Sequence, residues 1–173
     1  MAHRPPDIVP AVPEDLSGIM AIARACFGAG YLNEETLSPG FLHVARPPGE
    51  PGGVAGFVYG LEGAVPVGGG RMAGIVKTVA VDARFRRQEM GEGLLRSMEG
   101  RLAAAGLRDI FVPAWDDGGA VALKPLLDRL GYVPVLDAGR CWKGGCDAGK
   151  FRCPARKGEC MCRMVWFRKG REG

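Results

Sequence analysis

The feature that most constrains the fold is a long apolar strand followed by an Arg-rich turn and a Leu-rich helix. Residues 72–81 (MAGIVKTVAV) are rich in apolar and β-branched side chains, and this run ends just before the turn Asp82-Ala83-Arg84. Residues 91–105 then carry leucine and methionine at helical spacing, and Gly106 is placed to end the helix. This order predicts a central strand that leads directly into an amphipathic helix.

The remaining segments predict an α/β fold with a mixed central sheet flanked by helices. The chain has 173 residues, enough for one well-buried core and too few for two full domains. The order of elements excludes several all-helical and sandwich classes. Further strands are expected over residues 8–12, 41–46, 53–61, 109–113, 133–136 and 164–167. The strands 41–46 and 53–61 are expected to form a hairpin, and the strand 164–167 to close the sheet. Helices are expected from residue 13 through Phe27, over 33–38, and over 120–130 with its regular part beginning near Lys124 because of Pro125.

Charge and cysteine content divide the chain into an acidic body and a basic tail. Residues 1–138 contain 13 Lys and Arg against 16 Asp and Glu, whereas residues 139–173 contain 10 against 3. Five of the six cysteines also lie in the tail. The predicted organisation is therefore a body over 1–139, a Cys-rich basic loop over 140–163, and a final strand and tail over 164–173.

No segment of the sequence resembles a membrane span or a signal peptide. No run approaches the roughly 18 uninterrupted apolar residues that a span needs. The start, MAHRPPDIVP, lacks the basic and then apolar pattern of a signal peptide. We therefore expect a cytoplasmic protein with no membrane partner.

The turn between the central strand and its helix favours an anion site. The free backbone amides of the first helical turn and the helix dipole bind phosphate, and glycine lets the backbone approach the phosphate closely. The alternative is a solvated basic turn that only joins the strand to the helix, because short glycine motifs alone are weak evidence.

The same segment resembles motif A of the GNAT superfamily of acyl-CoA N-acyltransferases. In that motif an apolar strand ending in small residues is followed by an Arg-rich turn, a pyrophosphate loop and a Leu-Leu helix. Aligned without gaps on Val79-Ala80-Val81 and Leu94-Leu95, residues 86–91 occupy the family's Arg/Gln-x-x-Gly-x-Gly loop. Leu130-Gly131-Tyr132 is similar to the family's Leu-Gly-Phe/Tyr. The resemblance covers roughly residues 8–138 and implies the GNAT fold with acetyl-CoA as co-substrate.

The resemblance also implies where the cofactor would bind. Main-chain groups of Val79 and Val81 would contact the acyl carbonyl and the pantetheine arm, and the amides of the loop would wrap the pyrophosphate. The cofactor-binding residues implied in this way are Val79, Ala80, Val81, Arg87, Gln88, Glu89, Met90, Gly91 and Glu92.

Three positions depart from the family pattern. Glu89 stands where the first loop glycine belongs; the shifted match Gln88-x-x-Gly91-x-Gly93 fits the pattern literally but breaks the spacing to the Leu-Leu helix. Leu127 stands where many members carry the tyrosine that protonates the CoA thiolate. The central strand offers Lys77 and no acid, so the family's usual acid and base are not visible.

Weak candidates for a catalytic acid or base are Asp116 and Asp117, which follow the 109–113 strand. A solvated Asp-Asp-Gly-Gly turn is the more ordinary interpretation of these residues. Trp115 suits either an acceptor pocket or the core, and His43 suits a structural role in a strand.

The Cys-rich loop suggests metal binding. Clustered thiols in a reducing compartment favour a metal or redox role over disulfides, and the surrounding basic residues would offset the charge of a zinc–thiolate site. The spacing lacks a pair of Cys-x-x-Cys motifs, which leaves open an iron–sulfur site, disulfides or inert thiols. Such a loop would order the acceptor side of the pocket, dock a polyanionic partner, or only staple a glycine-rich segment. The predicted zinc ligands are four of the five residues Cys141, Cys146, Cys153, Cys160 and Cys162.

The function predicted from the sequence is transfer of an acetyl group from acetyl-CoA to a primary amine of a small molecule or protein. The alternatives are a catalytically degenerate acyl-CoA-binding sensor and a zinc-dependent interaction module. No signature of nucleic-acid recognition is present, so no specific nucleic-acid partner is expected. A homodimer is compatible with the sequence.

Overall fold

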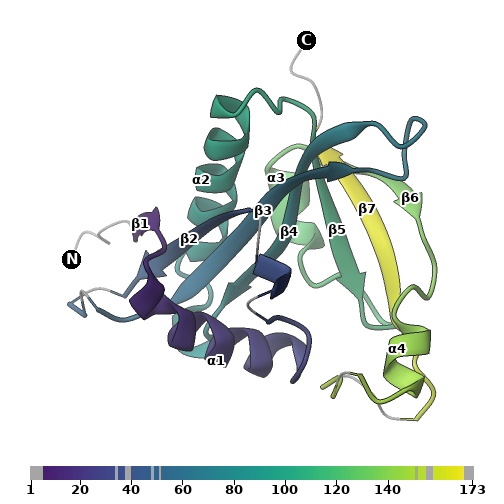
Figure 1. Ribbon diagram of the computed structural model, residues 1–173, viewed down its shortest axis with the longest axis horizontal. Helices are drawn as coiled ribbons and strands as arrows, with labels where there is room; N and C mark the ends of the chain where they lie inside the picture. Colours follow the sequence, from purple (N-terminus) through teal and green to yellow (C-terminus); the bar gives the residue numbers. More distant parts are fainter. Residues whose placement is uncertain are drawn as a thin grey trace.

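The computed structural model describes residues 6–33, 35–37, 40–47, 49–50, 52–150, 152–154 and 158–169, which form a seven-stranded sheet with helices packed on it (Figure 1). The strands are β1 (Asp7–Pro10), β2 (Phe41–Arg46), β3 (Gly56–Ala64), β4 (Met72–Val81), β5 (Ile110–Asp116), β6 (Tyr132–Asp137) and β7 (Arg163–Lys169). The α-helices are α1 (Leu16–Phe27), α2 (Met90–Ala104), α3 (Lys124–Arg129) and α4 (Lys143–Asp147), with 3-10 turns η1 (Pro13–Asp15), η2 (Glu35–Leu37) and η3 (Ala83–Phe85).

The sheet is mixed, which confirms the predicted fold class. Strands β1 to β4 are antiparallel neighbours, and β2 and β3 form the predicted hairpin. Strand β5 lies parallel to β4, and the full order is β1-β2-β3-β4-β5-β7-β6. The last strand therefore does not lie at an edge of the sheet: β7 lies between β5 and β6 and pairs antiparallel with both.

The sheet buries a separate apolar core on each face. The α2 face includes Leu94, Leu95 and Met98, all fully buried, packed with Val58 of β3. The α1 face includes Ile19 and Ile22, packed with Phe57, also of β3. Because successive side chains of a strand point to opposite faces, the adjacent residues Phe57 and Val58 serve the two cores.

Several element boundaries differ from the sequence prediction. Strand β5 continues to Asp116 because its outer half pairs with β7. Helix α4 was not predicted, since its sequence, KGGCD, contains two glycines and has low helix propensity. Of the predicted 33–38 helix only the 3-10 turn η2 is seen, and residues 34, 38 and 39 lie outside the described residues, as do 170–173 of the final segment. Among the described residues, none of the helices combines the length and apolar character needed to span a bilayer.

A buried ion pair fixes the start of α1 to the sheet. The Asp15 side chain is 3% exposed and is bound by the guanidinium of Arg46 from β2, whose Nη2 donates to Oδ2 at 3.0 Å. The same carboxylate accepts a hydrogen bond from the Val12 amide at 2.9 Å. Burial alone would raise the pKa of Asp15, but these hydrogen bonds and the positive charge of Arg46 hold it below its ordinary value.

We predict that Arg46→Met destabilises the protein by about 3 kcal/mol at pH 7, because it leaves Asp15 buried without its cation. The lowered pKa of Asp15 means that this stabilisation is present above the ordinary carboxyl pKa near 4 and is lost as pH falls through the folded-state pKa. Urea unfolding from pH 7 down to pH 3 should therefore show the difference between the wild type and the variant shrinking with acid. Lys124→Met, which removes the exposed pair with Asp128, is the control and should change little. A pH-independent difference would contradict the assignment.

Candidate active site

The candidate site forms where β4 and β5 separate. The two strands pair only at Gly74 with Ile110 and at Ile75 with Phe111. A β-bulge follows on β4, because Gly60 of β3 pairs with Val76 and Tyr59 with Thr78, which leaves Lys77 without a register partner. Beyond this point a cavity of about 640 Å³ opens between the strands.

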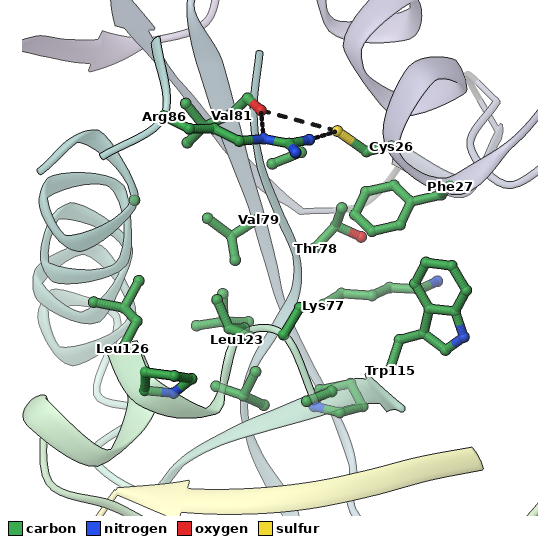
Figure 2. Close-up of a pocket in the computed structure, with 18 of the residues that line it drawn as sticks. Cys26, Phe27, Lys77, Thr78, Val79, Val81, Arg86, Trp115, Leu123 and Leu126 are labelled. Atoms are coloured by element: carbon green, nitrogen blue, oxygen red, sulfur yellow. Dashed lines mark hydrogen bonds between the residues drawn. The ribbon is translucent and has the colours of Figure 1, made fainter. Parts of the chain in front are cut away.

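The cavity has two sides, one on each side of β4 (Figure 2). We call them the α2 side and the α1 side after the helix that borders each. On the α2 side, Val79 of β4 faces Leu123, which directly precedes α3, and Leu126, which belongs to α3. The α1 side holds Lys77 and Thr78 of β4, Phe27 of α1, and Trp115 of β5.

The N-terminus of α2 forms the end of the cavity near the Arg-rich turn. The first helical hydrogen bond runs from the Gly93 amide to the Glu89 carbonyl at 3.0 Å, so the amides of Met90, Gly91 and Glu92 precede it and have no acceptor within the helix. Met90, Gly91 and Glu92 line the cavity together with Arg87 and Arg129. Amides at a helix start with nearby arginines suit a phosphate group.

Glu89 has the backbone conformation of a glycine. Its φ is 60°, in the left-handed region, and Arg87 with φ 63° is the other non-glycine residue of this kind among those described. A glycine at this position would adopt that conformation without strain. The geometry therefore fits the ungapped register, in which Glu89 occupies the glycine position of the loop.

Arg86 joins the two sides of the cavity. Its Nε donates to the Val81 carbonyl at 3.1 Å, and its Nη2 lies 3.5 Å from the Cys26 sulfur (Figure 2). Arg86 thus satisfies the Val81 carbonyl, at the end of β4, with a hydrogen bond. Nothing local in the sequence indicates this contact between Cys26 and a turn 60 residues away.

Aromatic side chains form the wall of the α1 side. The Phe27 ring lies 4.6 Å from that of Tyr31 and 6.3 Å from that of Trp115, measured between ring centroids. The Tyr31 hydroxyl lies 3.4 Å from the Thr78 hydroxyl. Burial raises the pKa of Tyr31, and the contact with Thr78 lowers it only in part, so the phenol stays protonated and can donate a hydrogen bond into the cavity.

The predicted catalytic residues lie apart from this wall. Asp116 accepts a hydrogen bond from the Gly118 amide at 2.9 Å, and Asp117 accepts from Gly119 at 3.1 Å, as in an ordinary turn. Neither is among the described residues that line the cavity, whereas Trp115 is. Leu127, at the family's tyrosine position, is fully buried in the α2 core.

The Cys-rich basic loop predicted over 140–163, here called the Cys-rich segment and described for residues 140–150, 152–154 and 158–163, covers the α1 side. Cys146, Cys160 and Cys162 are buried together, against Trp115, Trp142 and Cys153. The segment is held to the end of α1 by a hydrogen bond from the Arg152 amide to the Ala29 carbonyl at 3.2 Å. Cys146, Cys153 and Cys162 line the cavity beside Trp142.

The thiols do not assemble into the predicted metal site. Within the described part of the chain, no three His, Cys, Asp or Glu side chains are grouped so that they could hold a metal ion. Cys141 is exposed, whereas Cys146, Cys160 and Cys162 are buried, and its thiol donates to the Ala138 carbonyl at 3.2 Å. Burial and the neighbouring thiols of Cys153 and Cys160 raise the pKa of Cys162 to about 12, and a hydrogen bond with Trp115 opposes this only in part. The predicted zinc ligation therefore has no support here.

Comparison with known proteins identifies the fold. No profile of a known protein family matches the sequence, and no curated protein matches it. Among solved structures, Naa20 of Chaetomium thermophilum in complex with a bisubstrate analogue is 15% identical, with a TM-score of 0.67 over 94% of this chain and 85% of that one. A GCN5-related N-acetyltransferase from Kribbella flavida is 20% identical, with a TM-score of 0.65 over 95% and 98% of the two chains. A ribosomal-protein-alanine N-acetyltransferase from Brucella melitensis is 17% identical, with a TM-score of 0.65 over 94% and 98%.

The chain therefore has the fold of the GCN5-related N-acetyltransferases, abbreviated GNAT, as the resemblance implied. At these identities the likeness establishes the fold alone.

We predict that Gly28→Ala loosens the Cys-rich segment. Gly28 has φ 92°, and a Cβ there would lie 1.9 Å from the Arg152 carbonyl oxygen, so the backbone would have to move. We expect a loss of about 2 kcal/mol in the free energy of unfolding and faster reaction of the buried thiols with a disulfide reagent. Gly106→Ala is the matched control, because Gly106 has φ 85° but open space around it. Equal thiol reactivity in the two variants would contradict the proposed contact.

Proposed function

We propose that the protein is an N-acyltransferase that moves an acetyl group from acetyl-CoA to the amine of a small molecule or protein. The observation that carries the proposal is the two-sided cavity between β4 and β5, with the α2 N-terminus at the end of one side and the aromatic α1 side opposite it. This arrangement lets a cofactor and an acceptor approach the same point from opposite sides of β4.

The α2 side suits the cofactor. The amides of Met90, Gly91 and Glu92, with Arg87 and Arg129, would hold the pyrophosphate. Main-chain groups of Val79 and the amide of Val81, where β4 has left β5, would hold the pantetheine arm, since Arg86 already binds the Val81 carbonyl. Acetyl-CoA would supply the activated acyl group.

The α1 side suits the acceptor. The amine nitrogen attacks the acyl carbon, the new N–C bond forms as the C–S bond breaks, and the proton released by the amine ends on the CoA thiol or in water. The Tyr31 hydroxyl, held beside Thr78, can orient the acceptor by a hydrogen bond. Positioning of two bound reactants can by itself supply much of the rate of such a transfer. Zinc has no part in this proposal.

The second candidate is an acyl-CoA-binding sensor without activity. It is favoured by Leu127, which removes the family's usual proton donor, and by the placement of Asp116 and Asp117 in a turn. The two candidates differ in one measurement: purified protein with acetyl-CoA and a panel of amines either releases free thiol in an amine-dependent way or does not. Binding of acetyl-CoA by calorimetry without any release would favour the sensor.

We predict that Arg87→Gln weakens CoA binding about three- to tenfold, because Arg87 lines the cavity at the α2 N-terminus. Arg84→Gln is the control, since Arg84 lies in the same turn, pairs with Asp82 at 2.9 Å and does not line the cavity among the described residues. Calorimetric titration with CoA measures both. A larger loss in Arg84→Gln than in Arg87→Gln would place the phosphates elsewhere.

We predict that Glu89→Gln strengthens CoA binding by about threefold, because it removes a carboxylate beside the phosphates. Glu89→Gly should strengthen binding similarly and also raise the free energy of unfolding by up to about 1 kcal/mol, since glycine adopts φ 60° without strain. Comparing the two variants by calorimetry and urea unfolding separates the effect of the Glu89 charge on CoA binding from the effect of its backbone strain on stability. Weaker binding in both variants would show that Glu89 assists the cofactor.

A further inference from the structure

Lys77 stands at the point where the cavity begins. It is the residue of the β4 bulge, between Val76 and Thr78, and it is exposed in the cavity wall. Its side chain extends across the α1 side, which Trp115 also lines (Figure 2). The bulge is what turns this side chain toward the acceptor side, because an extra residue re-aims the strand locally.

The α1 side holds this positive charge without a carboxylate to balance it. Of the described residues that line the cavity, the acidic ones are Glu89 and Glu92, and both belong to the start of α2 on the other side. Glu92 is moreover paired with Arg96 at 2.9 Å. Within the described part of the chain the Lys77 ammonium has no ion pair or hydrogen bond, whereas Lys124 pairs with Asp128.

The rest of the α1 side is aromatic and covered. Phe27, Tyr31, Trp115 and Trp142 line it, and buried thiols of the Cys-rich segment complete the wall. The hydrogen bond between Arg152 and Ala29 holds that segment against the end of α1. A site with aromatic walls and a cation that has no carboxylate partner suits a compact ligand that has a flat apolar body and an anionic group.

We propose that the acceptor is a small aromatic amine that carries a carboxylate, of the aromatic amino acid class, and that Lys77 determines this specificity by binding the carboxylate. The proposal rests on the proposed function for the identity of the reaction. The binding preference that it assigns to Lys77 can be measured without turnover.

The test uses two compounds that differ in one group: L-phenylalanine, and 2-phenylethylamine, which lacks the carboxylate. Each is titrated calorimetrically into the wild type, Lys77→Met and Arg108→Met, with and without saturating CoA. Methionine keeps most of the length of the lysine side chain, and Lys77 is exposed, so the variant should fold; thermal unfolding checks this. Arg108→Met removes an exposed positive charge that, among the described residues, is not part of the cavity lining.

We expect the wild type to bind phenylalanine roughly tenfold more tightly than phenylethylamine, as for a hydrogen bond between charged groups. Lys77→Met should bring the two affinities within about twofold, mainly by weakening phenylalanine, while Arg108→Met keeps the preference. Equal affinities in the wild type, an unchanged preference in Lys77→Met, or no binding of phenylalanine would each overturn the assignment.

Thiol release with acetyl-CoA and the same two compounds separates this inference from the proposed function. A preference for phenylalanine that depends on Lys77 but is accompanied by no release supports the acceptor site and contradicts acyl transfer. Release that is equally fast with both compounds, and equally fast in Lys77→Met, supports acyl transfer and overturns the role of Lys77.

Discussion

The cavity exists because β4 separates from β5 after only two pairs of residues in parallel register. In a continuous sheet, the main-chain groups of β4 that face β5 would be satisfied by the neighbouring strand. Here residues 76 and 78–81 pair with β3 on one side and border the cavity on the other. Main-chain polar groups seldom remain without partners, so this edge calls for water or a ligand with amide-like groups. The bulge at Lys77 makes the separation possible, because it kinks β4 where the pairing stops.

The two cores of the sheet keep the halves of the cavity distinct. One face is filled by α2 and its leucines, and the helix directs its N-terminal amides to the end of β4. The other face is filled by α1, whose last turn supplies Phe27 and Cys26. The ion pair between Asp15 and Arg46 fixes the start of α1 to β2, and therefore also sets where the end of α1 lies. The positions of Phe27 and Cys26 on the α1 side thus depend on a contact at the opposite end of the helix.

What could be predicted from the sequence was local. The β4-to-α2 junction is one contiguous segment with a strand composition, a turn and a helical period, so the fold and the position of the proposed cofactor loop follow from it. The α1 side could not be found in this way. Its residues come from α1, β4, β5 and the Cys-rich segment, and only the order of strands brings them together. The position of β7 between β5 and β6 likewise depends on long-range pairing and could not be predicted locally, because an apolar strand fits equally well at an edge of the sheet. The cysteines suggested a metal by their number, but their spacing says nothing about which sulfurs meet.

A cation on the acceptor side also changes how the missing acid–base pair should be understood. An amine must be neutral to attack a thioester, and in an amino acid the adjacent carboxylate favours the protonated form. A carboxylate bound by Lys77 no longer exerts that effect fully, and the ammonium of Lys77 itself disfavours a second positive charge nearby. Burial among Phe27, Tyr31 and Trp115 acts in the same direction, because an apolar wall disfavours a charged amine. On this proposal, the residues that select the acceptor also favour its reactive form, and a dedicated general base becomes less necessary than in a site lined by acids.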